Sequence, residues 1–308
     1  MHKSLFDIPI NPYFSHKQFQ NEALRRSTSL PKDIRLSLHK FSHHGNSDGY
    51  ILFPRIALEN VNITTPASHK EAKERNCFIS ESVLSIFGNY LGTLFAYEQE
   101  SNSSYFNNIR PTIKNKNEQS SESSNVFLEL HTEMAFHEII PDFVLLYCLK
   151  EDRNYQAETG VASIRNVIKK LTKKSILELT KNQYKISADL SFIKNNNIKN
   201  KKTIPILYGS IEDPYMIYDA DTITCCSTKS QLALNELDEL LRKEIKLINL
   251  KSGDLIIIDN RRSVHSRSEF TAYLDGNDRW LQRSFIKTCC VTPEKLLQKK
   301  LTVVDLPA

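Results

Sequence analysis

Apolar residues recur along the chain with two different periods, and each period predicts a different kind of element. Spacings of three and four residues mark an amphipathic helix, whereas short apolar runs bounded by turn residues mark strands. The helical period occurs in the segments 82–97, 164–179 and 229–245. Short apolar runs predict strands at 49–53, 126–130, 253–259 and 279–290.

The order of these elements favours a mainly β fold with flanking helices. Short strands joined by turns are typical of a barrel or jelly roll, and they argue against alternating βαβ units. Asp275-Gly276, which precedes the last strand, is the strongest hairpin-turn signal in the chain. The length of 308 residues permits two domains or one domain with insertions.

The charge of the chain is only mildly basic, with 41 Lys and Arg against 36 Asp and Glu. The polar segments 115–125 and 194–202 are expected to be loops. Either the loop 115–125 or the segment around 160–202 is a candidate lid. No aromatic residues are interleaved with the Lys-rich run, which argues against a nucleic-acid partner.

The sequence motifs that mark several common activities are absent from the chain. The chain contains no G-x-G-x-x-G, G-x-x-x-x-G-K or H-E-x-x-H motif. Its six cysteines form no C-x-x-C pair, which favours reduced thiols. The longest apolar run, 143–149, is too short to cross a bilayer, and the N-terminus lacks the apolar region of a secretory signal. We therefore expect a cytoplasmic protein without a membrane partner.

Two histidines and one glutamate stand where strands are predicted to end. His131 and Glu133 follow the strand at 126–130, and alternation along a strand would point both side chains to one face. His265 follows the strand at 253–259 and its turn. Two imidazoles and a carboxylate form the facial triad of non-haem Fe(II) enzymes, although zinc accepts the same ligands.

Two arginines follow the last of these histidines. Arg279 lies fourteen residues after His265, and Arg283 lies four residues further along the predicted strand. Period-2 geometry would place both guanidinium groups on one side, where each could bind a carboxylate through two hydrogen bonds. A 2-oxo acid and an amino acid would supply two such carboxylates. The alternative is a pair of surface arginines on an edge strand.

Residues 131–152 and 252–286 resemble the two signature regions of the clavaminate synthase-like branch of the Fe(II)/2-oxoglutarate-dependent oxygenases. This branch includes hydroxylases of free L-arginine, L-asparagine and L-lysine. Further similar motifs occur in the expected order near residue 95, at 109–111 and at 205–221. The resemblance implies a double-stranded β-helix (jelly roll, cupin-like) core in one oxygenase domain, 1–308. A flanking segment at about 1–48 and a helical and loop insertion at about 160–202 would surround it.

The resemblance also implies roles for individual residues. His131, Glu133 and His265 match the iron ligands of the family. Arg279 matches the arginine that binds the distal carboxylate of 2-oxoglutarate, and Thr159 matches a threonine that supports the same group. Arg283 matches the arginine that binds the α-carboxylate of the amino-acid substrate. For Thr159 the alternative is a turn or a cap of the helix that follows.

The residues that would bind the side chain and the α-amino group of the substrate are less clearly indicated. Asp219 and Asp221 fall where family members carry acidic residues that meet the substrate's side chain, which favours L-arginine, L-lysine or a relative. An Asp at the first position also serves amide-bearing substrates in this family, and a paired Asp motif is often only a solvated turn. The candidates for the α-amino group, or for similar polar contacts, are Gln99, Glu98, Asn125 and Ser124.

These implications define the expected reaction. The enzyme would use Fe(II), with 2-oxoglutarate and O2 as co-substrates, to hydroxylate a free L-amino acid at C3 or C4. Succinate and CO2 would be the co-products. The alternatives are hydroxylation or desaturation of an amide or modified amino acid, a non-oxidising metal-binding β-barrel that holds zinc, and an oxygenase acting on nucleic acid. The particular amino acid and the oligomeric state are not indicated by the sequence.

Overall fold

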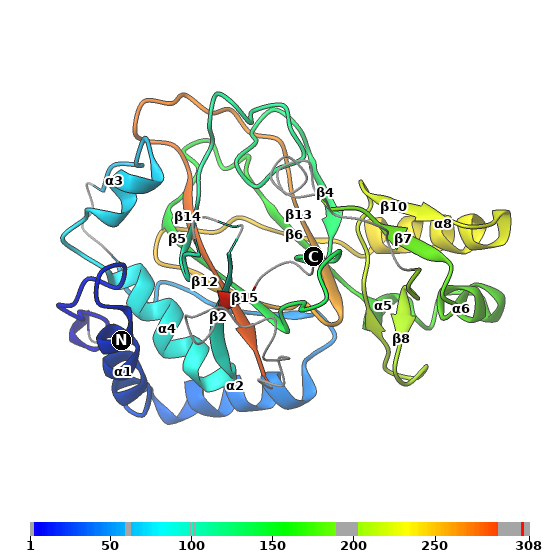
Figure 1. The fold of residues 1–308 in the computed structure, drawn as a ribbon, viewed down its shortest axis with the longest axis horizontal. Helices are drawn as coiled ribbons and strands as arrows, with labels where there is room; N and C mark the ends of the chain where they lie inside the picture. The colour runs from blue at the N-terminus through cyan, green and yellow to red at the C-terminus, as the bar shows by residue number, and fades with distance from the viewer. Residues whose placement is uncertain are drawn as a thin grey trace.

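Two β-sheets form the centre of the protein (Figure 1). The computed structural model describes residues 3–58, 63–98, 100, 103–188, 203–288 and 303–304. The major sheet has the strand order β1-β12-β5-β14-β2-β15, with β3 also paired to β14, and the minor sheet has the order β11-β6-β13-β4. The fold is therefore mainly β, as the sequence predicted.

The major sheet contains β1 (Tyr50–Phe53), β2 (Thr93–Tyr97), β3 (Asn107–Ile109), β5 (Phe143–Lys150), β12 (Leu255–Asp259), β14 (Trp280–Lys287) and β15 (Val303–Val304). The minor sheet contains β4 (Leu128–His131), β6 (Thr159–Ser163), β11 (Lys246–Ile248) and β13 (Ser263–Arg267). Two small ribbons pair β7 (Tyr184–Ile186) with β10 (Ile223–Cys225) and β8 (Leu207–Tyr208) with β9 (Tyr215–Met216). The helices are η1 (Lys3–Leu5), α1 (His16–Ser27), α2 (Lys32–His44), α3 (His69–Lys73), α4 (Ile79–Leu91), α5 (Ile164–Val167), α6 (Lys173–Leu179) and α8 (Thr228–Lys243).

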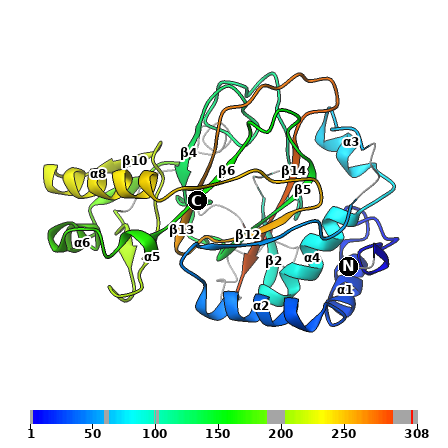
Figure 2. The ribbon, with the colours of Figure 1, turned by 180° about the vertical axis from the view of Figure 1, so that it is seen from behind.

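Helices cover the outer side of each sheet. α1, α2 and α4 gather beside the major sheet, and α6 and α8 lie at the opposite end of the molecule, as both views show (Figures 1 and 2). α4 packs on β5 and β14, and α8 contacts β6. One apolar cluster contains Leu237 and Leu241 of α8 together with Ala162 and Val264 of the minor sheet.

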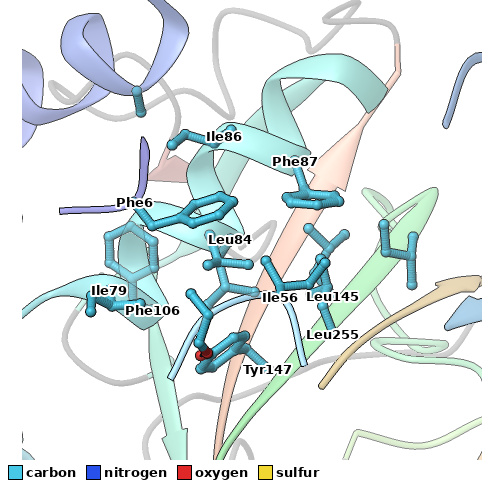
Figure 3. Packing of buried hydrophobic residues seen from close by; sticks show 14 of the residues in the cluster. Phe6, Ile56, Ile79, Leu84, Ile86, Phe87, Phe106, Leu145, Tyr147 and Leu255 are labelled. Atoms are coloured by element: carbon cyan, nitrogen blue, oxygen red, sulfur yellow. Dashed lines mark hydrogen bonds between the residues drawn. The ribbon is translucent and has the colours of Figure 1, made fainter. Parts of the chain in front are cut away.

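Alternation along the central strands builds two separate cores. In β12, Leu255 and Ile257 pack toward the helices, in a cluster that includes Phe87 and Tyr147 (Figure 3). Ile256 and Ile258 belong to a second cluster on the other face of the sheet, because successive side chains of a strand point to opposite faces. Each such fully buried side chain contributes about 1.5–3 kcal/mol to folding.

The helix predicted at 229–245 is confirmed as α8, and the predicted strands are confirmed with shifted ends. Ser227 starts α8 by accepting a hydrogen bond from the Ser230 backbone, and the Ser230 side chain accepts one from the Ser227 backbone. This reciprocal pair satisfies backbone donors that the first turn of a helix leaves free.

The helix predicted at 82–97 is wrong in its second half. α4 ends at Leu91, and Thr93–Tyr97 forms strand β2 against β14. Gly92 makes the change possible, since a Cβ there would lie 2.3 Å from the Lys287 carbonyl oxygen. The apolar residues of this strand therefore matched a helical spacing by chance.

The helical pattern predicted at 164–179 is confirmed as two short helices, α5 and α6, with a break between them. Ser163 and Thr172 each accept a backbone hydrogen bond as separate N-caps. Side chains such as Ile164, Leu171 and Leu179 still share one apolar cluster, so their periodicity reflects a common buried face. Part of the predicted insertion, 189–202, lies outside the described residues.

The hairpin predicted around Asp275-Gly276 does not join neighbouring strands. Gly276 has φ +81° and turns the chain, but β13 before it belongs to the minor sheet and β14 after it to the major sheet. The intervening segment bonds to other parts of the chain, for example from the Ser268 backbone to the Glu158 carbonyl. It is therefore a crossover between sheets.

No helix in the described ranges has the length and apolar character that crossing a membrane requires.

Candidate active site

A cavity of about 310 Å³ collects the polar residues predicted to act in chemistry. Its lining includes His131 of β4, Thr159 of β6 and His265 of β13 from the minor sheet. The major sheet contributes residues such as Leu146 of β5 and Arg283 of β14. A volume of this size suits small molecules rather than a macromolecular chain.

His131, Glu133 and His265 form a cluster that fits one metal ion. Their ligand atoms all lie within 4.8 Å of one another. His131 and His265 are directly opposite each other in the β4–β13 pairing, and Nε2 of His265 lies 3.4 Å from Oε2 of Glu133. The predicted triad is therefore brought together.

Glu133 reaches this cluster from a turn, whereas strand alternation was expected to place it. β4 ends at His131. Asn260 fixes the turn, since its Oδ1 accepts a hydrogen bond from the Glu133 backbone at 2.8 Å and its Nδ2 donates to the Glu133 and Pro141 carbonyls. Sequence reasoning missed Asn260, because nothing in its local pattern reveals a partner 127 residues away.

The orientation of one histidine is also set by the backbone. Nδ1 of His131 donates to the Glu129 carbonyl oxygen at 2.8 Å. A carbonyl oxygen only accepts, so the proton sits on Nδ1 and Nε2 keeps its lone pair for a metal.

The protonation states of the cluster also suit a metal. Burial raises the pKa of Glu133, but the charge of Arg283 and the two histidines outweigh burial and bring it to about 2. Burial and His131 lower the pKa of His265 to about 4. At neutral pH the site therefore offers a carboxylate and a neutral imidazole, the forms in which these side chains bind divalent metals.

Arg279 and Thr159 lie together at another part of the cavity wall. Nη2 of Arg279 donates to Oγ1 of Thr159 at 3.1 Å, and both residues are buried. Burial lowers the pKa of Arg279, and no carboxylate forms an ion pair with it in the described part of the chain. A second buried guanidinium is near, since burial, and after it the charge of Arg279, lower the pKa of Arg267 to about 10. This wall therefore favours an anionic ligand.

Arg283 lies on the same cavity, which confirms the prediction that both arginines face one site. Its Nη1 donates to both carboxylate oxygens of Glu133, at 3.0 and 2.9 Å. Its Nη2 donates to Glu100. Burial opposes the charge of Arg283, but these two carboxylates raise its pKa.

Asp219 and Asp221 both line the cavity. Asp219 forms an isolated antiparallel bridge with His131, and Asp221 lies in the turn that follows. Oδ1 of Asp219 accepts hydrogen bonds from the backbones of Asp221 and Thr222, each at 3.0 Å. Burial, Asp219 and Glu129 together raise the pKa of Asp221. Glu129 also lines the cavity, and its carboxylate is paired with Arg242 at 2.6 Å.

None of the residues predicted to bind the α-amino group is found in the described lining of the cavity. Gln99 lies outside the described residues. Glu98 is exposed, and Glu100, two residues on, lines the cavity in its place. Ser124 and Asn125 are absent from the described lining. From the same loop, the cavity is lined by Asn115, Gln119, Ser120, Ser121 and Glu122.

Comparisons with known proteins agree with this geometry. Residues 75–285 match the family described as taurine catabolism dioxygenase TauD, TfdA family. The chain is 30% identical over 287 residues to clavaminate synthase 2 of Streptomyces clavuligerus, covering 92% of this chain and 87% of that protein. It is 31% identical over 278 residues to L-lysine 3-hydroxylase of Catenulispora acidiphila, covering 89% and 76%.

A solved structure extends the comparison to the fold. Asparagine oxygenase in complex with Fe(II), 2S,3S-3-hydroxyasparagine and succinate superposes with a TM-score of 0.86 at 27% identity, covering 94% of this chain and 89% of that one. The protein therefore belongs to the TauD/TfdA dioxygenases and, within them, to the clavaminate synthase-like oxygenases that depend on Fe(II) and 2-oxoglutarate.

Proposed function

We propose that this protein hydroxylates a free L-amino acid at C3 or C4, with a basic amino acid as the favoured substrate. One observation carries the proposal. A single cavity contains a metal-binding triad, a buried arginine without an ion-pair partner in the described residues, a second arginine at the triad and an acidic wall. Each of these features suits one component of the reaction.

His131, Glu133 and His265 would hold Fe(II), and Arg279 with Thr159 would bind the distal carboxylate of 2-oxoglutarate. Together the bound metal and co-substrate supply the oxidation, in which 2-oxoglutarate and O2 yield succinate, CO2 and one hydroxyl group on the amino acid. The chain itself orients the reactants and limits the access of water. The planar guanidinium of Arg279 suits a carboxylate, because it offers two parallel donors.

Arg283 would bind the α-carboxylate of the amino acid. Its side chain is held against the metal ligand Glu133 by two hydrogen bonds, so a substrate bound there lies beside the triad. Nε of Arg283 is buried and has no hydrogen-bond partner within the described residues. A carboxylate would supply an acceptor for such a donor.

Asp219 and Asp221 would meet the side chain of the substrate. A guanidinium or ammonium group would balance these charges, which supports L-arginine, L-lysine or a relative. The similar proteins include one named for lysine and one for asparagine. An amide or modified amino acid, hydroxylated or desaturated, is therefore the second candidate, since a carboxylate also accepts hydrogen bonds from an amide.

We also propose that the major and minor sheets form the two halves of a double-stranded β-helix within one oxygenase domain. The placement of the site supports this arrangement, because the cavity takes residues from both sheets.

A mass-spectrometric screen tests the function. The protein would be incubated with Fe(II), 2-oxoglutarate, O2 and a panel of free amino acids. A product heavier by about 16 Da indicates hydroxylation, and one lighter by about 2 Da indicates desaturation. The variant His265→Ala should form neither product, whereas Asn235→Ala, on the exposed face of α8, should behave like the wild type. Absence of turnover with arginine, lysine, asparagine and their homologues would refute the proposal.

A further inference from the structure

Asn107 occupies a position beside Arg283 for which neither the motifs nor the proposed reaction has given a role. The two residues are directly opposite each other in the pairing of β3 with β14. Asn107 lines the cavity. Its neighbour Asn108 is engaged elsewhere, since its Oδ1 accepts hydrogen bonds from the Trp280 indole and the Gln282 amide. Asn108 also borders the cavity, but these two donors occupy its side-chain oxygen, whereas that of Asn107 is not engaged.

The side-chain oxygen of Asn107 has no donor. The residue is only 4% exposed, and Oδ1 is buried without a hydrogen-bond partner in the described part of the protein. Buried acceptors are nearly always satisfied, because leaving one without a donor is costly. An unsatisfied acceptor on the wall of a cavity indicates a ligand that brings its own donor.

The position of Arg283 identifies that donor. In a 2-amino acid the ammonium group is attached to the carbon next to the carboxylate. A carboxylate on Arg283 therefore brings the ammonium group near the residues that flank the guanidinium. Asn107 lies opposite Arg283 on the neighbouring strand, and Glu100 and Glu133 accept hydrogen bonds from the Arg283 guanidinium. These two carboxylates provide the negative charge that favours an ammonium group.

We propose that Oδ1 of Asn107 accepts a hydrogen bond from the α-ammonium group of the substrate, an inference that rests on the proposed function. The contact also separates the two acids that share the cavity. At this position 2-oxoglutarate would present a carbonyl oxygen where the carboxylates of Glu100 and Glu133 can only accept hydrogen bonds. Asn107, together with these two carboxylates, thus selects a 2-amino acid for Arg283 and leaves the 2-oxo acid to Arg279.

The test compares the binding of amino acids with that of their desamino analogues, which lack only the α-amino group. Calorimetry under anaerobic conditions, with Fe(II) and 2-oxoglutarate present, would measure binding of L-lysine, L-arginine and L-asparagine and of the three analogues. In Asn107→Ala, affinity for the amino acid that the wild type binds should fall about tenfold, as for loss of a hydrogen bond to a charged group. Affinity for its desamino analogue should change less than about twofold.

Two further variants keep the result interpretable. Asn107→Asp retains an acceptor oxygen and should retain the preference for the amino acid over its analogue, which guards against misfolding of the alanine variant. Asn235→Ala repeats the same substitution away from the cavity and should match the wild type. An equal loss of affinity for amino acid and analogue in Asn107→Ala would overturn the inference, as would no loss at all. Failure of the wild type to bind any amino acid would instead refute the proposed function, and the inference with it.

Discussion

Removing the charge of Arg283 should destabilise the metal-free protein far more than removing the charge of Arg279. Both arginines are buried, with exposed fractions of 8% and 6%. They differ in their partners, since Arg283 bonds to Glu133 and Glu100 whereas Arg279 donates to the neutral hydroxyl of Thr159. The substitutions Arg283→Gln and Arg279→Gln are therefore a matched pair.

The magnitude follows from what each substitution leaves behind. Arg283→Gln leaves Glu133, which is 5% exposed, without the guanidinium that lowers its pKa together with the two histidines. Removing one partner of a buried ion pair typically costs about 3–5 kcal/mol of unfolding free energy. Arg279→Gln removes a buried charge that has no carboxylate partner in the described residues, and glutamine can still donate to Thr159. Its cost should stay below about 1 kcal/mol, because burying an unpaired charge is itself unfavourable.

A divalent metal should reduce the difference in unfolding free energy between Arg283→Gln and Arg279→Gln. Zn²⁺ at the triad supplies positive charge to Glu133, so it should stabilise Arg283→Gln more than it stabilises the wild type. Urea unfolding of the three proteins, with a chelator and then with Zn²⁺, measures these changes. Equal stability of Arg283→Gln and Arg279→Gln in the chelator would refute this reading of the site's electrostatics.

Four further predictions follow from other contacts. Asn260→Ala should weaken metal binding about 10- to 100-fold, measured by competition with a chelating dye, because it frees the backbone of Glu133. Thr159→Val should raise the KM for 2-oxoglutarate about tenfold and leave that of the amino acid unchanged. Asp219→Asn should raise the KM of a basic amino acid about tenfold, since it removes a charge while retaining the oxygen that bonds the turn. The metal-free protein should lose roughly 3 kcal/mol of stability between pH 6.5 and pH 4, because the pKa of His265 is lowered from 6.5 to about 4 in the folded state.

The sign of the pH effect is fixed by proton binding. Below pH 6.5 the unfolded chain binds a proton at this histidine that the folded protein binds only near pH 4, so acid favours unfolding across that window. His265→Asn should flatten the slope, and an unchanged slope would contradict the assignment. Normal metal affinity in Asn260→Ala, an unaltered KM for 2-oxoglutarate in Thr159→Val, or equal losses for asparagine and lysine in Asp219→Asn would contradict the other three.

Much of the site could be predicted from the spacing of residues along the strands. His131 and His265 were predicted as ligands and prove to be paired across the sheet. Arg279 and Arg283 were predicted to share a side, and both line the cavity, Arg279 from the position just before β14 and Arg283 from within it. Such predictions succeed where one strand's geometry determines the direction of a side chain.

The residues that sequence reasoning missed depend on contacts distant in sequence. Asn260 supports Glu133 across 127 residues, and Asn107 gains its significance only from Arg283 on another strand. The predicted helix at 82–97 failed because the approach of Lys287 to Gly92, which ends the helix, leaves no trace in local periodicity. Tertiary contacts of this kind override local pattern.

The central claim is that one cavity binds 2-oxoglutarate through Arg279 and an amino acid through Arg283, beside Fe(II). Visible absorption under anaerobic conditions tests it most directly. The wild type should develop a charge-transfer band with Fe(II) and 2-oxoglutarate, and the substrate amino acid should then perturb that band. Arg279→Gln should form no band at the same 2-oxoglutarate concentration, and Arg283→Gln should form the band without responding to the amino acid. An unperturbed wild-type band, or a full response in Arg283→Gln, would contradict the account.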